Sequence, residues 1–122
     1  GVVDDSIVRG TTTPRIVNQI RKAGAREVHL RITAPPMTDP CYLGIDVARK
    51  SELIAARLTV PEIALAVGAD SLGYLSLPGL YQAVGVGSSV LGGGSGLCSG
   101  CFTGQYPVDI SVDDAALLAA AR

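Results

Sequence analysis

The sequence contains no tryptophan, one histidine and only 4% aromatic residues, although 48% of its 122 residues are hydrophobic. A buried core must therefore consist of aliphatic side chains from valine, isoleucine, leucine and alanine. No apolar run approaches the roughly 20 residues of a membrane span, and no basic segment followed by an apolar one marks a signal peptide at the N-terminus. These absences predict a cytoplasmic protein that has no membrane partner.

An excess of charge of either sign is also missing. The chain carries 10 lysine and arginine residues against 11 aspartate and glutamate residues, which gives a formal net charge of −1. A protein that binds nucleic acid usually carries a basic patch or a high isoelectric point. This balance therefore gives no reason to expect a nucleic acid or an anionic membrane as a partner. The length suits one domain.

Cysteine is scarce, and the three that occur are Cys41, Cys98 and Cys101. An odd number cannot form a complete set of disulfides, and a cytoplasmic protein keeps its thiols reduced. Three thiolates are one fewer than the four that a structural zinc ion or an iron–sulfur cluster usually takes. The Cys98-x-x-Cys101 spacing by itself leaves redox, zinc and cluster chemistry open, and three small buried thiols without a metal are the plain alternative. The only histidine, His29, lies on a predicted strand, where a solvated or hydrogen-bonded ring is favoured over a metal ligand.

The first 32 residues show the pattern of a strand, a loop, a helix and a second strand. The first strand ends at residues 2–3, the loop covers 4–12, and a helix runs over 13–24 with the Thr13 hydroxyl as its predicted cap. Apolar and polar residues alternate over 26–32, which is typical of a strand. This βαβ unit predicts an α/β fold with a parallel sheet and a right-handed crossover.

The rest of the chain predicts shorter elements. In order, they are an irregular connection over 33–50, helices over 52–57 and 59–68, a short strand over 72–75, a helix over 76–84 and a terminal helix over 113–122. Thr59 and Glu62 have the spacing of a capping box, which supports the second of these helices. Glycine and serine dominate residues 85–97, which predicts a flexible surface loop between a unit over 1–84 and a cysteine-containing segment over 98–122.

Acidic and hydroxyl side chains follow the first strand at the end where ligands bind in parallel sheets. Asp4 and Asp5 can serve sugar hydroxyls or a Mg²⁺ ion with its water shell. Gly10 permits a close approach of the backbone, and Thr11 and Thr12 add hydroxyls at a helix N-terminus, where phosphate binds well. Two adjacent acids alone would suggest only a solvated turn after a strand. The whole stretch instead predicts a site for a phosphorylated sugar.

Residues 2–12, Val-Val-Asp-Asp-Ser-Ile-Val-Arg-Gly-Thr-Thr, resemble the phosphoribosyl pyrophosphate (PRPP) signature of the purine and pyrimidine phosphoribosyltransferases. In detail they are similar to the glutamine PRPP amidotransferases, or amidophosphoribosyltransferases. Further stretches share this narrower resemblance, in order along the chain: 31–36, 40–46, 52–55, 68–72, 75–76 and 101–107. The resemblance implies part of a type I phosphoribosyltransferase fold, namely the βαβ unit with its parallel sheet, followed by a helical C-terminal region.

The resemblance also implies a site and a reaction. Asp4 and Asp5 would serve the ribose hydroxyls and the Mg²⁺ ion of bound PRPP. The residues that would form the cradle of the 5′-phosphate are Ser6, Ile7, Val8, Arg9, Gly10, Thr11 and Thr12. In the implied reaction, ammonia derived from glutamine attacks the anomeric carbon of PRPP and pyrophosphate leaves. The product is 5-phosphoribosylamine, which begins purine synthesis.

The three cysteines have a place in the same resemblance. Cys41, Cys98 and Cys101 match three of the four ligands of a 4Fe–4S cluster that some members of the family carry, and the fourth would lie upstream. The glutaminase domain of the family and the front half of its phosphoribosyltransferase domain have no counterpart in these 122 residues. We therefore expect a C-terminal fragment of the phosphoribosyltransferase domain, inactive alone, that works with the remainder of the enzyme in a homo-oligomer and under feedback inhibition by purine nucleotides.

Two other interpretations of the sequence stay open. The first is a different phosphoribosyltransferase, of salvage or pyrimidine metabolism, that shares only the loop. The second is a non-catalytic module that binds PRPP or a nucleotide, or that a metal stabilises. The cysteine set favours the amidotransferase over a simple salvage enzyme, which has no need of it.

Overall fold

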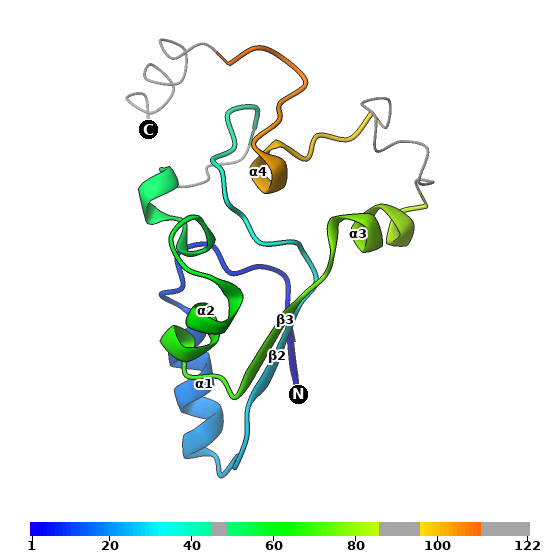
Figure 1. Ribbon diagram of the computed structural model, residues 1–122. Helices are drawn as coiled ribbons and strands as arrows, with labels where there is room; N and C mark the ends of the chain where they lie inside the picture. The colour runs from blue at the N-terminus through cyan, green and yellow to red at the C-terminus, as the bar shows by residue number, and fades with distance from the viewer. Residues whose placement is uncertain (45–48, 86–95, 111–122) are drawn as a thin grey trace.

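The structure is a computed structural model, which describes residues 1–44, 49–85 and 96–110. The predicted βαβ unit is confirmed, because the first two strands are parallel and a helix joins them (Figure 1). The sheet consists of three parallel strands that neighbour one another in chain order: β1 (Val2–Asp4), β2 (His29–Ile32) and β3 (Ser71–Tyr74). The predicted alternation in the second strand is also confirmed, since Val28, Leu30 and Ile32 are buried.

The register of the strands places their carboxyl ends at one edge of the sheet. Asp4 lies opposite Ile32, and Ile32 lies opposite Tyr74. Helices α1 (Thr13–Lys22) and α2 (Val60–Val67) lie together beside the sheet, and α2 contacts both β3 and α1 (Figure 1). The loop that follows β1 therefore emerges at the edge where parallel sheets bind ligands.

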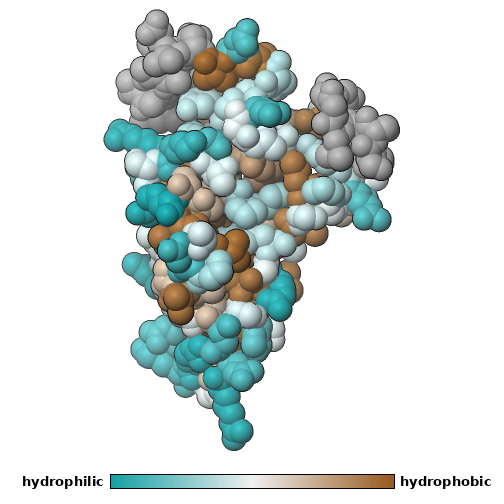
Figure 2. Space-filling view, viewed as in Figure 1, coloured by the Kyte–Doolittle hydropathy of each residue, from teal (hydrophilic) through white to brown (hydrophobic). Residues whose placement is uncertain are grey.

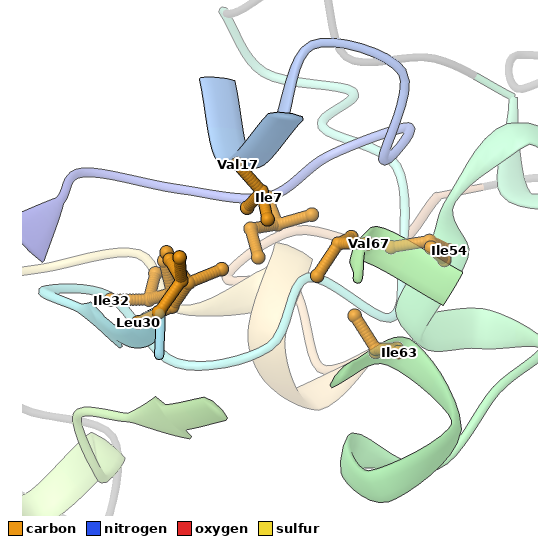
Figure 3. Packing of buried hydrophobic residues seen from close by; sticks show 8 residues of the cluster. Ile7, Val17, Leu30, Ile32, Ile54, Ile63 and Val67 are labelled. Carbon is orange, nitrogen blue, oxygen red and sulfur yellow. The ribbon is translucent and has the colours of Figure 1, made fainter. Parts of the chain in front are cut away.

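The core lies between this pair of helices and the sheet, and it is aliphatic as the composition predicts (Figure 3). Its buried members are Ile7, Val17, Val28, Leu30, Ile32, Ile54, Ile63 and Val67. Hydrophilic side chains gather around the end of α1 and the turn into β2 (Figure 2). This polar end of the molecule is remote from the loop that follows β1.

The start of α1 differs from the prediction. Thr12, and not Thr13, occupies the N-cap position, and its side chain makes no capping hydrogen bond. Thr13 is the first helical residue and is only 5% exposed, so its side chain packs inward and does not cap the helix. Pro14 lies in the first turn as predicted, and Gly24 follows the end of the helix with a φ of 103°.

The predicted helix over 52–57 is wrong. Two 3-10 helices, η1 (Lys50–Glu52) and η2 (Ile54–Ala56), take its place, and Leu53 between them is extended. The extended backbone of Leu53, with a ψ of 120°, interrupts the helix. The backbone N–H of Ile54, which would have no intrahelical acceptor in the first turn of a helix, donates to the carbonyl of Val8 at 2.9 Å.

Helices α2 and α3 match the predictions closely. The capping box of α2 is present, with the Glu62 carboxylate accepting from the Thr59 N–H at 2.7 Å, and Gly68 ends the helix in the left-handed region. Helix α3 (Leu77–Ala83) begins after Ser76, whose Oγ accepts from the Gly79 N–H at 3.1 Å. None of the helices in the described residues is long and apolar enough to cross a bilayer.

A fourth helix, α4 (Gly100–Thr103), was not predicted. It carries the second cysteine of the Cys-x-x-Cys pair. Most of the predicted flexible loop over 85–97 and the whole predicted helix over 113–122 lie outside the described residues.

Candidate functional site

The two acids lie where the first strand turns into the loop. Asp4 is the last residue of β1, and its carbonyl accepts from the Thr33 N–H at 3.0 Å, which ties it to the connection after β2. Asp4 Oδ1 accepts from the Asp5 N–H at 3.0 Å, and Asp5 Oδ1 accepts from the Ser6 N–H at 2.7 Å. Among the described residues, neither Oδ2 atom has a hydrogen-bond partner. Each carboxylate can therefore offer one oxygen to a sugar hydroxyl or to a hard cation such as Mg²⁺.

The middle of the loop is anchored in the core. Ile7 is only 3% exposed and belongs to the aliphatic cluster, and burial of such a side chain contributes about 1.5–3 kcal/mol. The next residue, Val8, accepts the Ile54 hydrogen bond described above. Gly10 has a φ of +72°, and a Cβ at this position would lie 2.5 Å from Ile54 Cδ1. Glycine is therefore required here both by the left-handed backbone and by the close approach of Ile54.

The end of the loop leads into α1 and presents backbone N–H groups that a ligand can use. In the part of the chain that the structure describes, the backbone N–H groups of residues 10–13 have no hydrogen-bond partner. Thr11 and Thr12 are exposed. The N-terminus of a helix carries a partial positive charge and free N–H groups, both of which favour an anion. The loop can thus receive a phosphate while the acids before it face a sugar.

The side chain of Arg9 leaves the loop toward η1. Its Nε lies 3.0 Å from Oε2 of Glu52, and the two side chains are 51% and 44% exposed. The sequence did not mark Glu52 or Ile54 as part of the site, although residues 52–55 share the family resemblance. No local signal could have done so, because more than forty residues separate them from the loop.

The structure brings the cysteine segment against the connection that contains Cys41. The carbonyl of Cys101 accepts from the N–H groups of Thr38 and Asp39 at 3.0 and 3.1 Å. The hydroxyl of Tyr106 donates to the Pro40 carbonyl at 2.6 Å. These bonds hold α4 beside residues 38–41.

The thiol of Cys101 has a shifted pKa. Burial raises this pKa, and the neighbouring thiols of Cys41 and Cys98 raise it further. The donor set of the three cysteines is of the soft thiolate kind that suits zinc or an iron–sulfur cluster. However, no three histidine, cysteine, aspartate or glutamate side chains in the described ranges are close enough together to hold a metal ion as they stand. The assignment of these cysteines to a cluster therefore stays a prediction.

His29 lies apart from these cysteines, as expected. Its Nδ1 is 2.9 Å from the Ser71 hydroxyl and its Nε2 is 3.1 Å from Glu27. Both ring nitrogens therefore have partners, one in β3 and one just before β2, which is the arrangement of a hydrogen-bonded strand histidine.

Tyr74 is a third residue of interest that the sequence did not mark. It lies at the carboxyl end of β3, opposite Ile32. Its hydroxyl is buried and has no hydrogen-bond partner within the described residues, and burial raises its pKa to about 12. The hydroxyl is therefore a neutral donor at any physiological pH.

The three-stranded parallel sheet, the loop after β1 and the helix α1 that follows it have the arrangement of part of a phosphoribosyltransferase fold. No family model matches the chain. Among curated proteins, the amidophosphoribosyltransferase of Methanocaldococcus jannaschii is 54% identical over 112 residues, which is 92% of this chain and 22% of that protein. The amidophosphoribosyltransferase of Bacillus subtilis is 49% identical over 112 residues, again 92% of this chain and 23% of that protein.

Solved structures give the same result. The glutamine PRPP amidotransferase from B. subtilis, complexed with ADP and GMP, matches with a TM-score of 0.79 and 50% identity, over 91% of this chain and 24% of that one. A structure described as the allosteric regulatory enzyme of purine biosynthesis matches with a TM-score of 0.80 and 49% identity, over 92% of this chain and 24% of that one. The chain spans about a quarter or less of the length of the relatives that it matches. It is homologous to a segment of the amidophosphoribosyltransferases, and the partial phosphoribosyltransferase fold inferred from the sequence is confirmed.

Proposed function

We propose that this chain supplies the PRPP-binding loop of an amidophosphoribosyltransferase. The observation that carries the proposal is the loop itself, in which two carboxylates with free oxygens precede a run of unengaged N–H groups at the start of α1. The enzyme would transfer ammonia from glutamine to PRPP and release 5-phosphoribosylamine and pyrophosphate. This reaction begins the de novo synthesis of purines.

Each part of the loop has a role in this reaction. Asp4 and Asp5 would accept hydrogen bonds from the ribose hydroxyls, and the residues from Ser6 to Thr12 would hold the 5′-phosphate. With the ribose fixed at both ends, the nitrogen of ammonia attacks the anomeric carbon, and the bond to the pyrophosphate oxygen breaks with its electron pair going to the leaving group. When bound, Mg²⁺ would neutralise the charge of the pyrophosphate. The oxygens of Asp4 and Asp5 that lack partners suit such an ion or its water shell.

The substitution Asp5→Asn in the complete enzyme tests the role of the acids. It should strongly reduce the synthesis of phosphoribosylamine from PRPP and free ammonia, while glutamine hydrolysis continues. Asp109→Asn is the matched control, because Asp109 is exposed and lies outside the loop. Unchanged ammonia-dependent synthesis in the Asp5 variant would refute the role that we give to this carboxylate.

We also propose that Cys41, Cys98 and Cys101 bind a 4Fe–4S cluster in the complete enzyme, together with a fourth ligand from elsewhere. The effect of Cys41 and Cys98 on the pKa of Cys101, and the hydrogen bonds that Cys101 in α4 accepts from Thr38 and Asp39, support this. Iron and acid-labile sulfide in anaerobically purified protein would support the cluster. Zinc would instead favour a metal-stabilised module, and the absence of both would contradict a metal at these thiols.

The partners and the compartment follow from the same proposal. The B. subtilis relative was solved with ADP and GMP, so we propose that purine nucleotides regulate the enzyme that contains this chain. We further propose that this enzyme is a cytoplasmic homo-oligomer. A lower rate of phosphoribosylamine synthesis when GMP is added at a fixed PRPP concentration would support this regulation. An unchanged rate would contradict it.

A further inference from the structure

Residues 50–54, here called the bracing segment, contact the loop at consecutive positions. The Ile54 N–H donates to the Val8 carbonyl at 2.9 Å. The side chain of Ile54 also fills the space where Gly10 lacks a Cβ, since a Cβ there would lie 2.5 Å from Ile54 Cδ1. A backbone hydrogen bond and a packing contact thus fix the loop on both sides of Arg9.

The third contact is the ion pair between Arg9 and Glu52. Only Nε of the guanidinium is engaged, at 3.0 Å from Glu52 Oε2, and within the described residues its two outer nitrogens have no partner. Both side chains are about half exposed, and exposed ion pairs contribute little to stability. The pair is therefore better suited to orient the guanidinium than to stabilise the fold.

The bracing segment is itself attached at its other end. Lys50 Nζ lies 2.6 Å from Asp39 Oδ1, and Asp39 donates its N–H to the Cys101 carbonyl at 3.1 Å. This ion pair links the bracing segment to the connection that α4 contacts. The position of the segment is fixed mainly by the burial of Leu53 and Ile54, which are 0% and 4% exposed.

We propose that Glu52 is a positioning residue of the phosphate site, which orients Arg9 and, together with Ile54, holds residues 8–10 in the shape that accepts the phosphate. The inference rests on the proposed function, because it takes PRPP as the ligand of the loop. Glu52 does not itself touch the substrate. It acts through Arg9, so its removal should weaken PRPP binding and leave the other substrate unaffected.

The test uses Glu52→Ala in the complete enzyme, with ammonia as the nitrogen donor. The KM for PRPP should rise about 1.4-fold to fivefold, the range expected for loss of one half-exposed ion pair. The kcat of the synthesis and the KM for glutamine in glutamine hydrolysis should stay unchanged. Glu52→Gln keeps an acceptor oxygen and should recover part of the loss. Glu27→Ala is the matched control, because it removes an exposed carboxylate that pairs with His29 at the other end of the sheet.

A double-variant cycle with Arg9→Gln completes the test. If Glu52 acts through Arg9, the double variant should have the same KM for PRPP as Arg9→Gln alone, since both changes remove one interaction. Additive effects, or an unchanged KM in Glu52→Ala, would overturn the inference. An equal loss in every kinetic parameter, together with a lower urea midpoint, would also overturn it by showing a merely structural role. A parent enzyme that shows no PRPP-dependent synthesis would instead refute the proposed function, so the two failures are distinguishable.

Discussion

The substitution Gly10→Ala would test the geometry of the loop most directly. An alanine in the left-handed region costs about 1–2 kcal/mol. The new methyl group would also lie 2.5 Å from Ile54 Cδ1. Because Ile54 is only 4% exposed, its side chain must leave its rotamer within a packed core, which adds about 0.5–1.5 kcal/mol. Alanine also restricts the unfolded chain, which offsets about 0.4–1 kcal/mol, so the net loss should be about 1–2.5 kcal/mol.

Two further variants separate the strain of the backbone from the overlap. Gly85 has a φ of +77°, close to that of Gly10, and no atom lies within 4 Å of its Cβ position. Gly85→Ala should therefore show the backbone strain alone and destabilise less than Gly10→Ala. Ile54→Val removes the methyl group that the alanine would meet, at its own cost of about 0.5–1.5 kcal/mol. In the Gly10→Ala background this second change should cost less than it does in the parent.

The free energy of unfolding from urea denaturation, followed by circular dichroism, measures these differences. The KM for PRPP provides a second readout, which should rise in Gly10→Ala and not in Gly85→Ala. If the two glycine variants are equally stable and the effect of Ile54→Val is additive, Ile54 does not press against the loop. That result would contradict the prediction.

Two other predictions concern pH. The backbone N–H of Val28 holds the pKa of Asp70 below its ordinary value of 3.8, so the stability from this carboxylate is present above pH 3.8 and is lost as the pH falls through the lowered pKa. Asp70→Asn should flatten the dependence of the urea midpoint on acid pH, and an unchanged slope would contradict this. Burial raises the pKa of Tyr106 from 10.0 to about 12, so its contribution is complete below pH 10 and is lost as the pH rises toward 12. Tyr106→Phe removes the hydrogen bond to Pro40 and should lower the free energy of unfolding by about 1 kcal/mol at neutral pH. It should also weaken the loss of stability at alkaline pH, so that only the part due to Tyr74 remains. Stability curves at alkaline pH that have the same shape for both proteins would contradict the assignment.

The features that the sequence determined are those encoded by neighbouring residues. The alternation in residues 26–32 predicted β2 and its buried face, and the spacing of Thr59 and Glu62 predicted the start of α2. Residues 2–12, together with the further stretches of resemblance along the chain, indicated the family to which the chain is homologous. Side chains two to four residues apart decide periodicity and capping, so such features can be read without knowing the path of the chain.

Only the tertiary structure decided which residues support that loop. Local pattern predicted a helix over 52–57, but the Ile54 N–H instead bonds to Val8, and Glu52 meets Arg9 across more than forty residues. Thr13 likewise turned inward to the core and did not cap α1. In each case a contact between distant segments outweighed a local preference. Local preferences amount to less than about 1 kcal/mol per residue, whereas burial of one aliphatic side chain contributes about 1.5–3 kcal/mol, and which segments meet is set by how the whole chain packs.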